Sequence, residues 1–153
     1  MEQATKVFAD FAAAFERTYA DDDWSRLTPF FSADACYEVR GGPYACTISG
    51  REAILSGLRK SINGFDRRCS ERRLELTRGP DVVETDLGHE VSISWRVTYK
   101  YKDAPKVVLP GRSAFTVAGN VIVAMRDEYN DEELADVGAW MAAHGDGLDG
   151  SYV

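Results

Sequence analysis

The segment from Arg112 to Tyr129 has the pattern of two β-strands joined by a tight turn. Gly119 and Asn120 lie at the turn, and both residue types tolerate the positive φ angles that two-residue hairpin loops require. Side chains alternate between the two faces of a strand, so Met125 and Asp127 share one face. A carboxylate at the end of an apolar row must find a partner, reach water or hold a proton. Asp127 is therefore the first candidate for a functional residue.

Alternation of apolar and polar residues also continues upstream of this hairpin. It predicts one antiparallel, strongly bent sheet over residues 69–129, with its longest strand from Val91 to Tyr101. Gly79-Pro80-Asp81 is expected to turn the chain before that strand. Pro110 predicts an edge position or a bulge in the strand that enters the hairpin. A shorter strand is expected over Asp34–Val39.

The segments outside the sheet have helical spacing. Apolar residues recur every three or four positions in residues 3–20 and 50–63, and again in residues 131–144. Helices grouped against one face of an antiparallel sheet make an α+β domain. We expect a curved sheet that forms a cone, with the first two helices across its concave face and a ligand cavity inside. The domain is predicted to span residues 1–145, and residues 146–153 are expected to form a flexible tail.

Composition narrows the classes of function. The net charge of −7 argues against nucleic acid or an anionic membrane as the main partner, and no apolar run approaches membrane-spanning length. Three cysteines, Cys36, Cys46 and Cys69, cannot all pair, which favours a reduced, cytoplasmic location. The chain has no metal-binding His or Cys motif and no glycine-rich phosphate loop, so we predict no metal and no organic cofactor.

Several stretches resemble the NTF2-like superfamily, and its SnoaL-like branch in particular. They are Asp23–Leu27, Phe30–Glu38, Ser49–Ile54, Gly119–Ile122 and Arg126–Asn130. The resemblance covers about residues 5–131 and implies the cone-shaped fold. It says less about function, because this fold hosts many chemistries.

Limonene epoxide hydrolase, a member of the same superfamily, uses an Asp-Arg-Asp triad assisted by Tyr and Asn. Matching its motifs implies that Asp127 is the water-activating carboxylate and that Arg96 and Tyr37 are retained. Thr98 stands in place of the acid Asp, however, and Val39 in place of the Asn. Only half of that machinery is therefore present, which argues against ordinary epoxide hydrolysis.

The ketosteroid isomerase pattern fits worse, because Phe15 and Val39 replace its Tyr and its general-base Asp. SnoaL-type polyketide cyclases give the closest functional comparison, since they place an acid/base Asp at the position of Asp127. The resemblance thus implies that Asp127 is a general acid/base, that Arg96 orients it or stabilises negative charge, and that Tyr37 donates a hydrogen bond. The residues expected to bind the substrate are Phe15, Tyr19, Trp24, Val39, Thr98 and Met125.

We therefore expect a cofactor-free enzyme that isomerises, cyclises or dehydrates a small, largely apolar molecule. Two alternatives remain open: an epoxide hydrolase-like activity with an incomplete triad, and a non-catalytic ligand-binding or dimerisation module. For Asp127 itself, the alternative is a structural ion pair with Arg96 or Arg126.

The orientation of the long strand also leaves two possibilities. The resemblance directs Arg96 into the cone and places an apolar row, Ile93, Trp95, Val97 and Tyr99, on the outer face. Such a patch would be exposed in a monomer, so this orientation predicts a homodimer through the outer face of the sheet. The opposite orientation puts Trp95 in the core and Arg96 in solvent.

Overall fold

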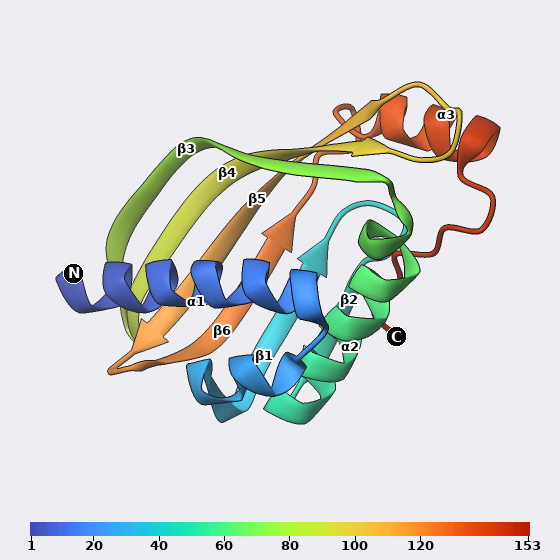
Figure 1. Cartoon of the computed structure of the whole chain (residues 1–153). Helices are drawn as coiled ribbons and strands as arrows, with labels where there is room; N and C mark the ends of the chain where they lie inside the picture. The colour runs from blue at the N-terminus through green and yellow to red at the C-terminus, as the bar shows by residue number, and fades with distance from the viewer.

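The computed structural model describes residues 1–153 and contains one six-stranded sheet with the strand order β2-β1-β6-β5-β4-β3. The sheet curves strongly, and its long strands arch over the helices (Figure 1). All neighbouring strands are antiparallel except β1 and β6, which are parallel. The strands are β1 (Phe31–Arg40), β2 (Cys46–Ser49), β3 (Glu71–Thr85), β4 (Gly88–Lys100), β5 (Val107–Ala118) and β6 (Val121–Glu128).

The helices lie on the concave side and at one end of this sheet. Helix α1 (Glu2–Asp21) crosses the concave face, and α2 (Arg51–Gly64) lies beside β1 and β2 (Figure 1). Helix α3 (Ala135–His144) lies at the far end of the long strands, and two short 3₁₀ helices are η1 (Trp24–Phe30) and η2 (Asp66–Arg68). The predicted α+β cone is confirmed. None of the helices is both long enough and apolar enough to cross a membrane.

The predicted turn at Gly79-Pro80-Asp81 is wrong, because β3 continues through it to Thr85. The pairing with β4 shifts register on both sides of Arg78 instead. Bulges of this kind bend a strand, and an edge strand such as β3 tolerates Gly and Pro. The prediction for Pro110 is confirmed, because β5 pairs with β6 only from Arg112 onward and has a free edge before it.

Two other elements differ from the prediction. Strand β2 was not predicted, and it pairs with β1 from Cys36 to Val39. The third helix begins at Ala135 rather than at residue 131, because residues 131–134 form turns. The parallel pairing of β1 with β6 places Tyr37 beside Met125 and Val39 beside Asp127. This pairing brings residues about ninety positions apart in the sequence to one place.

The core has two parts. The larger part packs α1, α2 and η1 against the concave face and includes Phe8, Phe11 and Phe115. The smaller part lies at the α3 end, where Trp140 packs with Tyr99 and Tyr101 of the sheet region.

Strand β4 has the opposite orientation to the one that the resemblance implied. Trp95 lines the interior of the cone, together with Ile93, Val97 and Tyr99. Arg96 lies on the outer face, where its side chain is 52% exposed and binds Glu75 at 3.1 Å. The prediction that Arg96 lies in the cone is therefore wrong, since alternation places a strand's charged row in solvent when its apolar row is buried. The argument for a homodimer through an exposed apolar row loses its basis.

The C-terminal residues 146–153 pack on the domain, in contrast to the flexible tail that was predicted. Leu148 and Gly150 are buried, and the tail runs back from α3 alongside α2 (Figure 1). The Ser61 hydroxyl donates a hydrogen bond of 2.6 Å to the carbonyl of Gly150, and the Asp149 amide donates to the carbonyl of Gly64. These contacts are between distant segments, so local composition does not predict them.

Candidate functional site: a carboxylate at the wall of an apolar cavity

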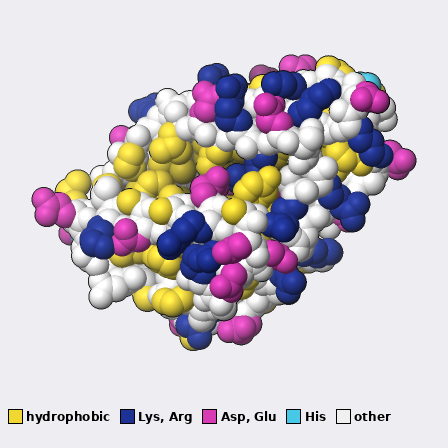
Figure 2. Space-filling model, viewed as in Figure 1, with side chains coloured by type: hydrophobic (Ala, Val, Ile, Leu, Met, Phe, Trp, Pro, Cys, Tyr) yellow, Lys and Arg dark blue, Asp and Glu magenta, His cyan; other side chains and the backbone are white.

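The concave face and the helices enclose a cavity of about 690 Å³. Hydrophobic residues make up 24 of the 35 that line it. Figure 2 shows hydrophobic side chains in the hollow between α1 and the long strands, with charged side chains around its rim. The volume and the apolar lining are typical of sites for small organic ligands.

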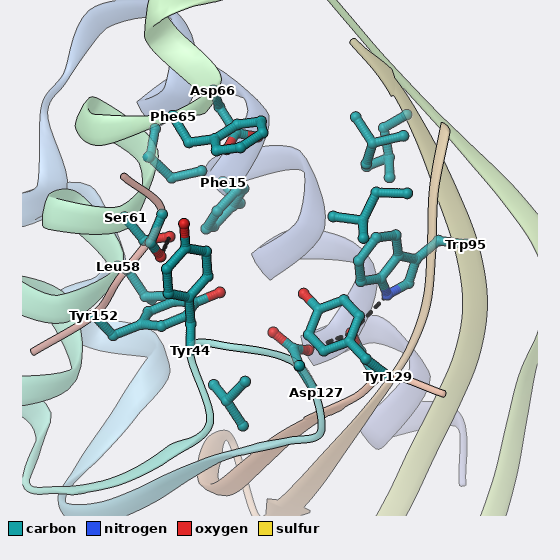
Figure 3. Close-up of a pocket in the computed structure, with 18 of the residues that line it drawn as sticks. Phe15, Tyr44, Leu58, Ser61, Phe65, Asp66, Trp95, Asp127, Tyr129 and Tyr152 are labelled. Carbon is teal, nitrogen blue, oxygen red and sulfur yellow. Dashed lines mark hydrogen bonds between the residues drawn. The ribbon is translucent and has the colours of Figure 1, made fainter. Parts of the chain in front are cut away.

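Asp127 lies at the wall of this cavity, where its two carboxylate oxygens accept hydrogen bonds from different donors. The Tyr37 hydroxyl donates to Oδ2, and the Ser113 hydroxyl donates to Oδ1 at 2.5 Å. Ser113 in turn accepts a hydrogen bond of 2.8 Å from the indole nitrogen of Trp95 (Figure 3). No ion pair includes Asp127, so the alternative of a structural ion pair with Arg96 or Arg126 is wrong: Arg126 binds Glu128 and Glu90.

Strand register explains why these side chains meet. Ser113 of β5 is directly opposite Asp127 of β6, and Val39 of β1 is beside Asp127 on the other side. Tyr37 lies two residues before Val39 and so points to the same face. Trp95 comes from β4, the next strand beyond β5. Four neighbouring strands therefore contribute to this one hydrogen-bonded chain.

The environment of Asp127 favours its protonated form. Burial raises the pKa of this carboxyl above its ordinary value of 3.8, whereas the hydrogen bonds from Ser113 and Tyr37 oppose the rise in pKa. Burial also raises the pKa of Tyr37 well above 10.0, and the charge of Asp127 adds to that effect. Tyr37 is consequently a neutral hydroxyl that donates to Asp127. The proton of Tyr37 is directed to Asp127 and is not free for a ligand.

A second buried carboxylate, Asp66, lines another part of the same cavity (Figure 3). Arg72 donates to Asp66 at 2.7 Å and to Glu16 of α1 at 2.9 Å, and the Tyr99 hydroxyl donates to Asp66 at 3.0 Å. The guanidinium group of Arg72 also lies 4.4 Å above the ring of Tyr19. Burial raises the pKa of Asp66, while Arg72 opposes that rise. This group joins η2, β3, β4 and α1.

The structure separates the predicted site residues into two sets. Five lie in the lining of the cavity, namely Asp127, Tyr37, Phe15, Val39 and Met125. The other four do not, namely Arg96, Thr98, Tyr19 and Trp24.

Each of the four has a different position. Thr98 shares the outer-face parity of Arg96 and is buried there. Trp24 is a core residue whose ring contacts Phe15 edge to face at 5.9 Å, so it supports the cavity wall from behind. Tyr19 is not part of the lining, but its ring contacts the lining residue Arg72. The structure thus places Thr98, Trp24 and Tyr19 outside the cavity lining, in which substrate contact was expected.

Sequence reasoning missed Ser113, Trp95, Asp66 and Tyr152 as site residues. Ser113 and Trp95 carry a detectable signal, because each has the parity of a cavity-facing residue once β4 and β5 are oriented by their apolar rows. Asp66 begins the short 3₁₀ helix η2 and Tyr152 lies in the irregular C-terminal tail, and neither segment has a periodic pattern. No group of three or more His, Cys, Asp or Glu side chains is arranged to hold a metal ion.

Comparison with known proteins agrees with this architecture. The SnoaL-like domain family matches residues 11–125, which is most of the chain. This chain belongs to that family. The family is part of the NTF2-like superfamily, as the sequence analysis predicted. A search of curated protein sequences found no match.

Several solved structures share the SnoaL-like fold of this protein. Bal32a, from a soil-derived mobile gene cassette, is 19% identical with a TM-score of 0.64, over 89% of this chain and 95% of that one. A candidate polyketide cyclase from Xanthomonas campestris is 24% identical with a TM-score of 0.56, over 86% and 97%. A protein with a ketosteroid isomerase-like fold from Catenulispora acidiphila, in complex with trimethylamine, is 20% identical with a TM-score of 0.55, over 84% and 92%. At these identities the likeness establishes the fold.

Proposed function

We propose that this SnoaL-like protein catalyses proton transfer on a small, largely apolar molecule that carries an oxygen function. One observation carries the proposal. Asp127 is a cavity-lining carboxylate held by neutral donors and by no cation. A structural carboxylate buried in a core is normally paired with a positive charge. A carboxyl whose pKa is raised can instead both accept and return a proton.

The neighbouring residues have distinct roles in this proposal. Tyr37 and Ser113 orient the carboxylate, and Trp95 fixes Ser113. Tyr129 also lines the cavity, and its ring contacts Trp95 at 5.9 Å. Its neutral hydroxyl would donate to the substrate oxygen on which negative charge develops. Isomerisation, cyclisation and dehydration all fit one carboxyl group combined with hydroxyl donors.

The epoxide hydrolase alternative loses support from the position of Arg96. That reaction uses an Asp-Arg-Asp triad, but Arg96 binds Glu75 on the opposite face of the sheet. Thr98, which replaces the second carboxylate, also lies outside the cavity lining. Of the three triad positions, Asp127 alone therefore lies in the cavity lining.

Solvent exchange of carbon-bound protons tests the proposal without knowledge of the natural substrate. We choose 2-tetralone, an apolar bicyclic ketone with acidic protons next to its carbonyl, dissolved in deuterated water. The wild type is expected to accelerate the loss of these proton NMR signals, and Asp127→Asn to reduce the enzymatic rate by a factor of about 10² to 10⁴. Glu75→Gln, on the outer face, is the control and should retain the wild-type rate.

The same preparations distinguish a structural from a catalytic role. Asp127→Asn keeps the size of the side chain and part of its hydrogen bonding, so its melting temperature should remain close to that of the wild type. An Asp127→Asn protein that melts early but exchanges 2-tetralone at the wild-type rate would contradict the proposal. So would a wild type that leaves the exchange rate at its value in buffer.

A second candidate function is non-catalytic binding of a small amine. It is favoured by the lack of a cationic partner for Asp127 and by the aromatic rings of Trp95, Tyr129 and Tyr152 in the lining, since such rings attract ammonium groups. The related protein from Catenulispora acidiphila was solved with trimethylamine. Tetramethylammonium would then bind more tightly than its uncharged isostere neopentane, with an affinity that rises with pH as Asp127 ionises. Equal affinities would exclude this candidate.

A further inference from the structure

We propose that Tyr152 is a ligand-binding residue of this site and that the C-terminal tail, residues 146–153, holds it in place. This inference rests on the proposed function of the Asp127 cavity and extends it, because it adds a hydroxyl donor from a segment outside the matched family region. Both Gly150 and Tyr152 line the cavity. The tail thus forms part of the cavity wall.

Small residues on α2 create the seat for this tail. Gly57, Ser61 and Gly64 are spaced by four and three residues and so share one face of the helix. A Cβ added at Gly57 would lie 3.0 Å from the carbonyl oxygen of Tyr152, and one at Gly64 would overlap the carbonyl oxygen of Asp149. The backbone of the tail therefore approaches α2 as closely as glycine allows.

Hydrogen bonds fix the tail at several points along its length. The Tyr101 hydroxyl donates to the carbonyl of Asp146 at 2.7 Å, at the start of the tail. The Ser61 hydroxyl donates to the carbonyl of Gly150 at 2.6 Å, and Lys60 binds the carbonyl of Val153 at its end. These bonds hold the tail on both sides of Tyr152.

The ring of Tyr152 packs against the residue that orients Asp127. The rings of Tyr152 and Tyr37 meet edge to face at 5.6 Å. In Figure 3 the hydroxyls of Tyr152 and Tyr129 both point toward the space beside the Asp127 carboxylate. A ligand oxygen next to Asp127 is therefore within the region that these two hydroxyls face.

The proton of Tyr152 is available to a ligand. The Tyr152 hydroxyl donates to no protein group, and the nearby hydroxyls of Tyr37 and Ser61 donate their protons to Asp127 and to the carbonyl of Gly150. Burial raises the pKa of Tyr152 and the charge of Asp127 raises it further, whereas the neighbouring hydroxyls of Tyr37 and Ser61 oppose the rise in pKa. Tyr152 is consequently a neutral donor at physiological pH.

A matched pair of probes, 2-naphthol and naphthalene, tests this role by binding alone. Both fill apolar space, but only 2-naphthol has an oxygen to accept a hydrogen bond. Tyr152→Phe keeps the ring and its contact with Tyr37, so it should weaken 2-naphthol binding about three- to tenfold, the value of one hydrogen bond, and leave naphthalene binding unchanged. Unchanged binding of 2-naphthol, or equal losses for the two probes, would overturn the inference, as would a wild type that binds no 2-naphthol.

Gly64→Ala tests whether the tail holds Tyr152 in place. Ser56→Ala, on the exposed face of the same helix, is the control. Gly64 does not have a positive φ, so alanine strains no backbone there and acts on the tail. We expect faster amide exchange in residues 149–153 and weaker binding of both probes in Gly64→Ala only. Wild-type exchange in the Gly64→Ala tail would contradict the proposed seating.

These measurements remain separate from the test of catalysis, because probe binding requires no turnover. If Asp127 proves inert while Tyr152→Phe loses 2-naphthol selectively, the proposed function fails and the binding role of Tyr152 stands. The reverse result would retain the function and remove Tyr152 from the site.

Discussion

Two buried carboxylates in one cavity differ in what surrounds them. Asp66 is bound by the guanidinium group of Arg72, whereas Asp127 is bound only by the neutral hydroxyls of Tyr37 and Ser113. Burial raises the pKa of both carboxyls, but only Asp66 has a cation that opposes the rise. Asp66 is therefore suited to hold elements together, and Asp127 to exchange a proton.

The raised pKa of Asp127 predicts a specific pH dependence of stability. Between 3.8, the ordinary carboxyl value, and the higher native pKa, the folded protein holds a proton that the unfolded chain has released. The stability that depends on Asp127 is thus fully present below 3.8 and decreases as pH rises through the native pKa. Asn does not titrate, so the unfolding free energy of Asp127→Asn should rise relative to wild type as the pH increases from 3.8 through the native pKa of Asp127. Urea denaturation across this range measures the difference; a difference that is flat or falls would contradict the prediction.

At the scale of elements, Arg72 connects β3 to η2 and α1. It donates to Asp66 and Glu16, and its side chain is only 6% exposed. Such a pair contributes little compared with apolar residues of the same volume, but removal of one partner leaves the other charge buried. The position of α1 over the concave face depends in part on this contact.

Arg72→Met should therefore destabilise the protein by about 3–5 kcal/mol, because Asp66 loses its countercharge. Adding Asp66→Asn to this variant should recover part of the loss. Arg96→Met provides the control, since it removes an exposed ion pair with Glu75 and should change stability by at most about 1 kcal/mol. Urea denaturation at neutral pH measures all four proteins. Equal effects of Arg72→Met and Arg96→Met would show that the buried network is unimportant.

At the scale of the whole molecule, the apolar row of β4 belongs to the cavity and not to the outer surface. Ile93, Trp95 and Val97 all line the cavity. Charged Arg96 lies on the outer face instead. An interface through this row is therefore not expected, and a change at Trp95 should act on ligand binding.

Trp95→Arg should abolish binding of 2-naphthol while the sedimentation mass stays equal to that of the wild type, whatever that mass is. The physical reason is that a guanidinium group replaces the apolar indole in the cavity wall and removes its hydrogen bond to Ser113, whereas the outer surface is unchanged. A shift of the variant to a smaller mass would contradict this prediction and restore the outer-face interface.

The sequence by itself determined the fold class, the hairpin around Gly119 and Asn120, and the shared face of Met125 and Asp127. These features follow from turn residues and from alternation along single strands, which are local properties. Alternation also correctly divided β4 into two faces. Alternation could not tell which of the two faces lies on the concave side. The resemblance assigned Arg96 to the concave side and Trp95 to the outer face, and the structure has the opposite arrangement.

Only the tertiary structure decided which side chains surround Asp127. Ser113 reaches it through the pairing of β5 with β6, and Tyr37 through the parallel pairing of β1 with β6. Asp66 comes from the short helix η2 and Tyr152 from the C-terminal tail, and the positions of these segments depend on contacts with β3 and α2. Such contacts join residues far apart in the sequence, and no periodic pattern encodes them. The cavity is thus predictable from local sequence as an apolar space, whereas its polar groups depend on how the strands and the tail pack.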